Sequence, residues 1–177
     1  QKFFPELRTL HALEHQKWNI LCPHGKPAKA LPFLESQPIH PTNSYGLSKS
    51  ALESIGLTLG KTYNIPTTIL RYSIVQGARQ SPRNLYSGAL RIFITQALKN
   101  EPITVYEDGM QKRDFVNIED VVRANLLALE NPKTDWGIFN VGAGKGYKVL
   151  DFAKLVKKIT SSNSPIILGG FRRTDTR

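Results

Sequence analysis

The chain of 177 residues contains one cysteine, Cys22, which excludes an intrachain disulfide framework. It has no apolar run of roughly 18 residues, so a membrane-spanning helix is not expected. The opening QKFFPELRTL lacks the long apolar segment and the cleavage site of a signal peptide. Hydrophobic residues make up 40% of the chain, enough for a sizeable core in one domain. Together these features predict a soluble, cytoplasmic protein.

Acidic residues are few compared with basic ones. Lys and Arg total 24 and Asp and Glu total 14, so the formal net charge is +10. Such an excess suggests an anionic partner, which could be nucleic acid, an acidic membrane face or a phosphorylated small molecule. No run of five or more basic residues occurs, and a scattered excess is more typical of general solubility than of a nucleic-acid surface.

The pattern changes near Pro41. Residues 1–40 hold all four histidines and many prolines, and they predict a short helix over 6–16 followed by an irregular segment. The rest alternates between helical and extended patterns, which predicts an α/β fold with parallel strands. The expected helices are 43–64, 87–100, 118–130 and 148–160; the expected strands are 65–75, 102–109, 113–118, 137–144 and 164–170.

Tyr45 and Lys49 lie in the first of these helices, which Asn43 or Ser44 would cap. Residues four apart share a helix face, so Lys49 is expected to stand over Tyr45. A free phenol, with a pKa of about 10, is a poor base, but an adjacent ammonium favours the phenolate. The pair could therefore perform acid–base chemistry, although Y-x-x-x-K also arises by chance on solvated helices. The same helix is expected to bury an apolar stripe; its members are Leu47, Ala51, Ile55 and Leu59.

Several later segments carry a family resemblance. LRYSIVQGARQ at 70–80 is followed by NLYSGALRIFITQALKN, EDGMQKRDFVNIEDVVRA and GIFNVGAGKGYKVLDFAKLV. In this order they resemble the extended short-chain dehydrogenase/reductases, and more narrowly the NAD-dependent epimerase/dehydratase family that acts on nucleotide sugars. The resemblance covers residues 41–177. It implies a partial Rossmann-type fold with a parallel sheet and a small C-terminal substrate-binding lobe, while residues 1–40 resemble an insertion.

The resemblance also assigns roles to residues. Tyr45 becomes the catalytic acid/base, Lys49 its partner and a ligand of the cofactor ribose, and Ser73 a neighbour of the nicotinamide of NAD. Asn84, Arg113 and Arg172 become anchors of the substrate's diphosphate, for which a guanidinium fork is well suited. An ion pair with a nearby aspartate is the alternative for Arg113. The family pattern has an asparagine at position 74, where this chain has an isoleucine that cannot donate a hydrogen bond.

One family element is not found upstream of Tyr45: the Gly-rich turn that binds the dinucleotide. The family's catalytic Ser or Thr also has no clear counterpart there. We therefore expect the chain to be the second half of an enzyme, without the N-terminal dinucleotide-binding half. NVGAGKG at 140–146 does not fit a phosphate-binding loop and is interpreted as a turn into a helix from Val149.

The histidine-rich front allows two metal hypotheses. HALEH at 11–15 fits the inverted zincin pattern H-x-x-E-H. A structural zinc site is the other; its ligands would be Cys22, His24 and two of His11, His15 and His40. The interpretation we favour has no metal and treats this part as a surface segment that packs through Trp18, Leu21 and Phe33.

The predicted reaction in the intact enzyme is a transient oxidation of a sugar hydroxyl. Tyr45 takes the proton, NAD takes the hydride, and the hydride returns after the carbon is inverted or water is lost. The expected partner is a nucleotide sugar, and the family suggests a homodimer. The alternative is a non-catalytic module that binds a nucleotide sugar or another anion. The isoleucine at 74 and the lack of a Gly-rich turn favour that alternative.

Overall fold

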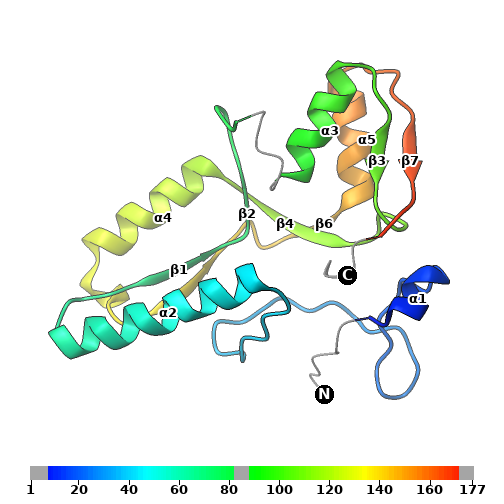
Figure 1. Cartoon of the computed structure of the whole chain (residues 1–177). Coiled ribbons are helices and arrows are strands. Elements are labelled where there is room, and N and C mark those ends of the chain that lie inside the picture. Colours follow the sequence, from blue (N-terminus) through cyan, green and yellow to red (C-terminus); the bar gives the residue numbers. More distant parts are fainter. Residues whose placement is uncertain (1–7, 82–87, 172–177) are drawn as a thin grey trace. The chain divides into compact units, whose positions relative to one another are not determined.

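The computed structural model describes residues 8–81 and 88–171, and its elements are shown in Figure 1. The chain forms two compact units, each assembled from separate stretches of sequence. As far as they are described, unit 1 comprises Gln1–Ala30, Ala78–Asp114 and Lys145–Arg177, and unit 2 comprises Leu31–Gly77 and Phe115–Gly144. Among the described residues, no helix is both long and apolar enough to cross a bilayer.

Unit 2 is built on helix α2 (Ser44–Tyr63). Asn43 is its N-cap, and the side-chain oxygen of Asn43 accepts the backbone N–H of Gly46 at 2.8 Å, which confirms the predicted capping position. The helix ends at Asn64, whose φ of 53° is left-handed and reverses the chain into strand β1 (Ile69–Tyr72).

Parallel strand pairs support unit 2. Strand β1 pairs in parallel with β5 (Ile138–Val141), and β2 (Ile74–Gln76) pairs in parallel with the second half of β4 (Lys112–Asn117). Helix α4 (Ile118–Glu130) follows β4, and the 3-10 helix η1 (Pro132–Thr134) leads to β5. The predicted single strand over 65–75 is thus two strands.

The apolar stripe expected to be buried on α2 is exposed. Leu47 is 61% exposed, Ile55 53% and Leu59 50%, and Ala51 is exposed as well. The helix instead seats on the β1 segment through a neighbouring stripe that includes Gly56 and Gly60. Periodicity identified residues that share a face but not which face the strand would cover.

Unit 1 has its own core of two helices and two parallel strands. Helices α3 (Ala89–Leu98) and α5 (Val149–Ile159) lie side by side against strands β3 (Ile103–Val105) and β7 (Ile166–Leu168) (Figure 1). The buried core residues are Phe93, Ala97, Ile103, Val105, Ala153 and Val156. This order confirms the α/β prediction for the later part of the chain.

Strand β6 (Gly146–Lys148) was not predicted from the sequence. It pairs antiparallel with the first half of β4, with Arg113 opposite Tyr147. Helix α5 then begins at Val149, as expected. The segment interpreted as a turn is therefore a turn followed by a short strand.

The front of the chain contains helix α1 (Leu10–Glu14), which is shorter than the predicted helix over 6–16. Thr9 caps it, and Leu13 is fully buried. Trp18 is half-buried, with its ring 6.4 Å from that of Phe171. The prediction that Leu21 and Phe33 also pack against the main body was wrong, because these side chains are 54% and 75% exposed.

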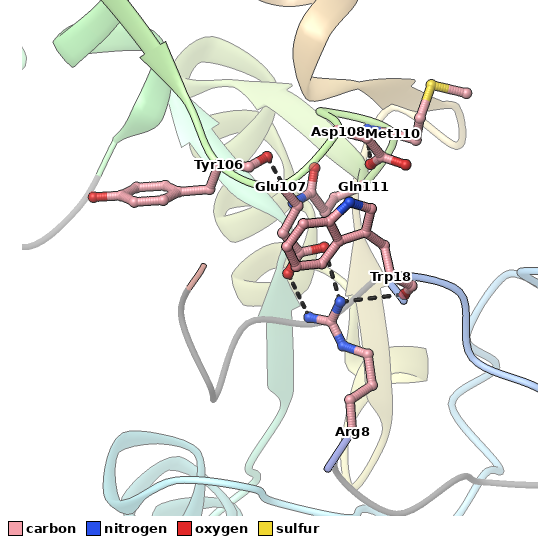
Figure 2. Close-up of polar contacts among 7 residues, drawn as sticks. All are labelled: Arg8, Trp18, Tyr106, Glu107, Asp108, Met110 and Gln111. Carbon is pink, nitrogen blue, oxygen red and sulfur yellow. Dashed lines mark hydrogen bonds and ion pairs between the residues drawn. The ribbon is translucent and has the colours of Figure 1, made fainter. Parts of the chain in front are cut away.

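Within unit 1, a buried ion pair fastens the front of the chain to the turn after β3 (Figure 2). The Arg8 guanidinium donates to both carboxylate oxygens of Glu107, at 2.8 and 2.6 Å, and to the carbonyl of Trp18 at 3.2 Å. Glu107 has a left-handed φ of 56°, in the turn after β3. The side-chain amide of Gln111 donates to the Tyr106 carbonyl at 3.2 Å and closes this turn.

Candidate functional site

Tyr45 and Lys49 lie one above the other in the first two turns of α2. The Lys49 ammonium nitrogen is 5.5 Å from the centre of the Tyr45 ring. Tyr45 is 55% exposed and Lys49 is also exposed, so both are accessible in unit 2. A cation over the ring face attracts the aromatic quadrupole and holds the two side chains together. The predicted geometry of the pair is present, while its chemical role stays a prediction.

The pair belongs to the helix stripe that seats on the β1 segment. A Cβ atom on Gly60 would lie 2.2 Å from the Thr67 hydroxyl oxygen, and one on Gly56 would lie 3.7 Å from the Ile69 side chain. One turn earlier, Glu53 pairs with Arg71 at 2.5 Å. Helix α2 and strand β1 therefore run in opposite directions: residues nearer the start of α2 lie against residues nearer the end of β1.

This register leads to the carboxyl end of β1. Ser73 follows the last residue of β1, and its backbone N–H donates to the carbonyl of Val141 on the neighbouring strand at 2.9 Å. Lys49 and Tyr45 continue the stripe of α2 in the same direction, one and two turns before Glu53. Thus the three residues expected to meet the cofactor lie toward one end of this helix–strand pair.

Of the three expected phosphate anchors, Arg113 alone lies within the described residues. Arg113 lies on β4 in unit 1, is half-buried, and donates to the carbonyl of Lys112 at 2.8 Å. Asn84 and Arg172 lie outside the described residues. The roles predicted for these three residues stay predictions.

Arg71 is a polar residue of the site region that sequence reasoning missed. Its Nε and Nη2 atoms donate to the Glu53 carboxylate at 2.8 and 2.5 Å, and Nη1 donates to the Glu35 carbonyl at 3.4 Å. The hydrogen bond to Glu53 raises the pKa of Arg71 above its ordinary value. An arginine within the apolar strand pattern TTILRYSIV was the available signal, since a charge there needs a partner.

Glu35 was also missed. Its carboxylate accepts the backbone N–H of Asn140 on β5 at 2.9 Å, and the Asn140 side chain donates to the Phe33 carbonyl at 3.0 Å. The bond from Asn140 is the main cause that lowers the pKa of Glu35, and the nearby Arg71 charge adds to the effect. These bonds attach the segment before α2 to strand β5.

The described residues hold no group of three His, Cys, Asp or Glu side chains arranged to bind a metal ion. The rings of His11 and His15 lie 4.1 Å apart, and His15 Nδ1 is 2.8 Å from the His11 carbonyl oxygen. That nitrogen is thus engaged with the helix backbone. The two metal hypotheses gain no support from this arrangement.

Comparison with known proteins identifies the class. Residues 22–142 match the model of the NAD dependent epimerase/dehydratase family. This match covers more than half of the chain, so the chain belongs to that family. Tyr45, Lys49, Arg71 and Ser73 all lie within the matched region.

Individual relatives are nucleotide-sugar enzymes by name. A putative UDP-glucose 4-epimerase of Methanocaldococcus jannaschii is 42% identical over 76% of this chain and 42% of its own length. A UDP-glucose 4-epimerase of Thermotoga maritima, solved with UDP-glucose, has a TM-score of 0.76 at 36% identity over 84% of this chain and 47% of that one. A UDP-glucuronic acid 4-epimerase of Bacillus cereus, solved with UDP-glucuronic acid and NAD, has a TM-score of 0.71 at 31% identity over 79% and 44%. The chain spans less than half the length of these relatives.

Proposed function

We propose that the protein carrying this chain is an NAD-dependent nucleotide-sugar epimerase or dehydratase, in which these residues supply the proton-transfer pair. The observation that carries the proposal is the stacked Lys49 and Tyr45 pair within the region matched to the family. Membership of the family raises this pair above a chance Y-x-x-x-K, because the surrounding segments agree with it.

The residues present fit a nicotinamide dinucleotide. An exposed ammonium and a phenol on one helix face suit the hydroxyls of a ribose. Ser73 lies toward the same end of the helix–strand pair. When bound, NAD would supply the acceptor for a hydride from the sugar carbon.

Tyr45 would take the proton of the sugar hydroxyl as that carbon is oxidised, and return it when the carbon is reduced. A positioned acid–base group contributes about 10²–10⁴-fold to rate. Lys49 would stabilise the phenolate, because a cation near an anion favours the charged form. The phenol and ammonium are adjacent and accessible, as this sequence of proton transfers requires.

The proposed substrate class is a pyrimidine nucleoside diphosphate sugar, as in the names of the relatives. Arg113, Asn84 and Arg172 would contact its phosphates, in line with a formal net charge of +10. We also retain a cytoplasmic location and a homodimer as parts of the proposal. Light scattering of the purified protein would test the dimer.

The experiment is to add UDP-glucose and NAD to the purified full-length protein that carries this chain and to follow sugar interconversion or water loss by NMR, with calorimetry of UDP-glucose binding alongside. Turnover supports the enzyme, and other UDP- and dTDP-sugars then define the substrate. If the protein binds these sugars but turns over none of them, the result would instead support the non-catalytic module, which the isoleucine at 74 favours. A protein that neither binds nor turns over any of these sugars would overturn both hypotheses.

A further inference from the structure

Arg71 stands at the centre of a polar cluster that joins three parts of unit 2. Its guanidinium forms a two-pronged ion pair with Glu53 of α2, and the two side chains are only 25% and 13% exposed. A third nitrogen of the same group donates to the carbonyl of Glu35 in the segment before α2. One side chain of β1 thus contacts both the helix and the chain that enters it.

The helix partner lies on the face that carries the candidate catalytic pair. Glu53 follows Lys49 by four residues and Tyr45 by eight, which is one turn and about two turns of an α-helix. Side chains at such spacings point to the same side. A bidentate bond to Glu53 therefore fixes the rotation of α2 about its axis, and with it the direction of Lys49 and Tyr45.

Other contacts along the stripe are too weakly directional to set this rotation alone. Gly56 and Gly60 have no side chains, and a Cβ atom added to them would lie 3.7 Å from Ile69 and 2.2 Å from the Thr67 hydroxyl oxygen. Such glycine contacts bring helix and strand close but tolerate small rotations. The planar fork of the guanidinium matches a carboxylate in one geometry, so it supplies the missing constraint.

The second arm of the cluster holds the entry to the helix. The Glu35 carboxylate accepts the N–H of Asn140, and the Asn140 side chain donates to the Phe33 carbonyl. Arg71 and β5 therefore fix residues 33–35 from two sides. The chain from there reaches the N-cap Asn43 within eight residues, two before Tyr45.

We propose that Arg71 is a positioning residue that, through Glu53 and Glu35, holds the helix of Tyr45 and Lys49 in its working orientation against β1. This inference rests on the proposed function for the meaning of that orientation. No contact of the Arg71 guanidinium with Tyr45 or Lys49 is needed, because the constraint passes through the helix backbone.

The test compares Arg71→Met and Glu53→Gln with Tyr72→Phe in the full-length protein that carries this chain. Tyr72 is the neighbouring residue of β1, and its hydroxyl donates to the side chain of Asn125 on α4 at 2.9 Å. The control therefore removes a hydrogen bond that joins the same strand to a different helix. The readouts are the nuclear Overhauser effects between the α-protons of Gly56 on α2 and the δ-methyl group of Ile69 on β1, which report the rotation of the helix against the strand, and the amide exchange rates of α2. Both are measured below the thermal midpoint of every variant.

We expect Arg71→Met to lose at least half of the Gly56–Ile69 Overhauser intensity and to raise exchange in α2 about tenfold, and Glu53→Gln to do the same to a smaller degree. Tyr72→Phe should change both by less than twofold. Lowered thermal midpoints with an unchanged Gly56–Ile69 intensity in the folded protein would overturn the proposal, since a merely structural role gives that result. So would an equal effect of the control.

If Arg71→Met does not fold, Glu53→Gln and Arg71→Lys decide the matter by the same criteria. Lysine keeps the charge but not the fork, so Arg71→Lys should lower the Gly56–Ile69 Overhauser intensity despite a nearly normal thermal midpoint. An unchanged intensity in both variants would refute the proposal. These readouts need no substrate or cofactor, so they separate a failure of the positioning role from a failure of the proposed enzymatic function.

Discussion

Arg8 and Glu107 form a bidentate ion pair across 99 positions of the chain, and their side chains are only 7% and 0% exposed. Taking two charges out of water is costly, and their mutual attraction offsets this only when both partners are present. The pair thus ties the front of the chain to the turn after β3, and each partner depends on the other.

Removing one partner should be strongly destabilising. Arg8→Met removes both guanidinium hydrogen bonds from the buried Glu107 carboxylate and is expected to lower the free energy of unfolding by about 3–5 kcal/mol. Urea unfolding followed by circular dichroism measures this loss. The double variant Arg8→Met/Glu107→Met should recover most of the stability, because no charge then remains buried. A double variant as unstable as the single one would contradict this account of the pair.

Two glycines of α2 should respond in opposite ways to the same substitution. Gly60→Ala places a Cβ atom 2.2 Å from the Thr67 hydroxyl oxygen and 3.0 Å from the Ile65 carbonyl oxygen. The overpacking is expected to cost about 1–3 kcal/mol, more than the helix propensity of alanine returns. Gly56→Ala meets only Ile69 at 3.7 Å and should stabilise by about 0.5–1 kcal/mol. Thermal unfolding of both variants gives the comparison, and equal signs would show that the helix does not seat on β1 at Gly60.

Glu35 should make stability depend on pH in the acidic range. The Asn140 N–H lowers the pKa of Glu35 in the folded protein, so the unfolded chain binds its proton at a higher pH. The stabilising contribution is therefore complete above the ordinary glutamate pKa of about 4.3, and it is lost as pH falls through the lower, folded pKa. The stability difference between the natural chain and Glu35→Gln should be larger at neutral pH than at about pH 3. Unfolding in urea at both pH values measures it, and a difference independent of pH would disprove the linkage.

The sequence was sufficient for local features. A 3.6-residue period placed Lys49 over Tyr45, and the pair Asn43 and Ser44 marked the start of α2 to within one residue, because both features depend on bonds within one helix. The bounds of α4 at Ile118 and Glu130 agree with the amphipathic pattern for the same reason. The order of helices and strands also indicated parallel pairing, which the structure confirms.

Tertiary contacts could not be predicted from the sequence. The stripe from Leu47 to Leu59 is periodic, but its exposure depends on which side of α2 meets β1. The Arg71–Glu53 pair joins a strand to a helix, and no local pattern specifies the partner of a charge. The interruption of the strand at Ser73 is not marked by a proline or glycine there. In each case the decisive contact comes from residues distant in the chain.

The central claim is that Tyr45 transfers the proton of a nucleotide sugar. Its most direct test is the kcat for the sugar substrate of the protein carrying this chain, compared between Tyr45→Phe and the control Tyr63→Phe. Tyr63 lies on the same helix and is 68% exposed. The account predicts a loss of about 10²–10⁴-fold in kcat for Tyr45→Phe and a change of less than twofold for Tyr63→Phe. A Tyr45→Phe variant that turns over as fast as the control would contradict it.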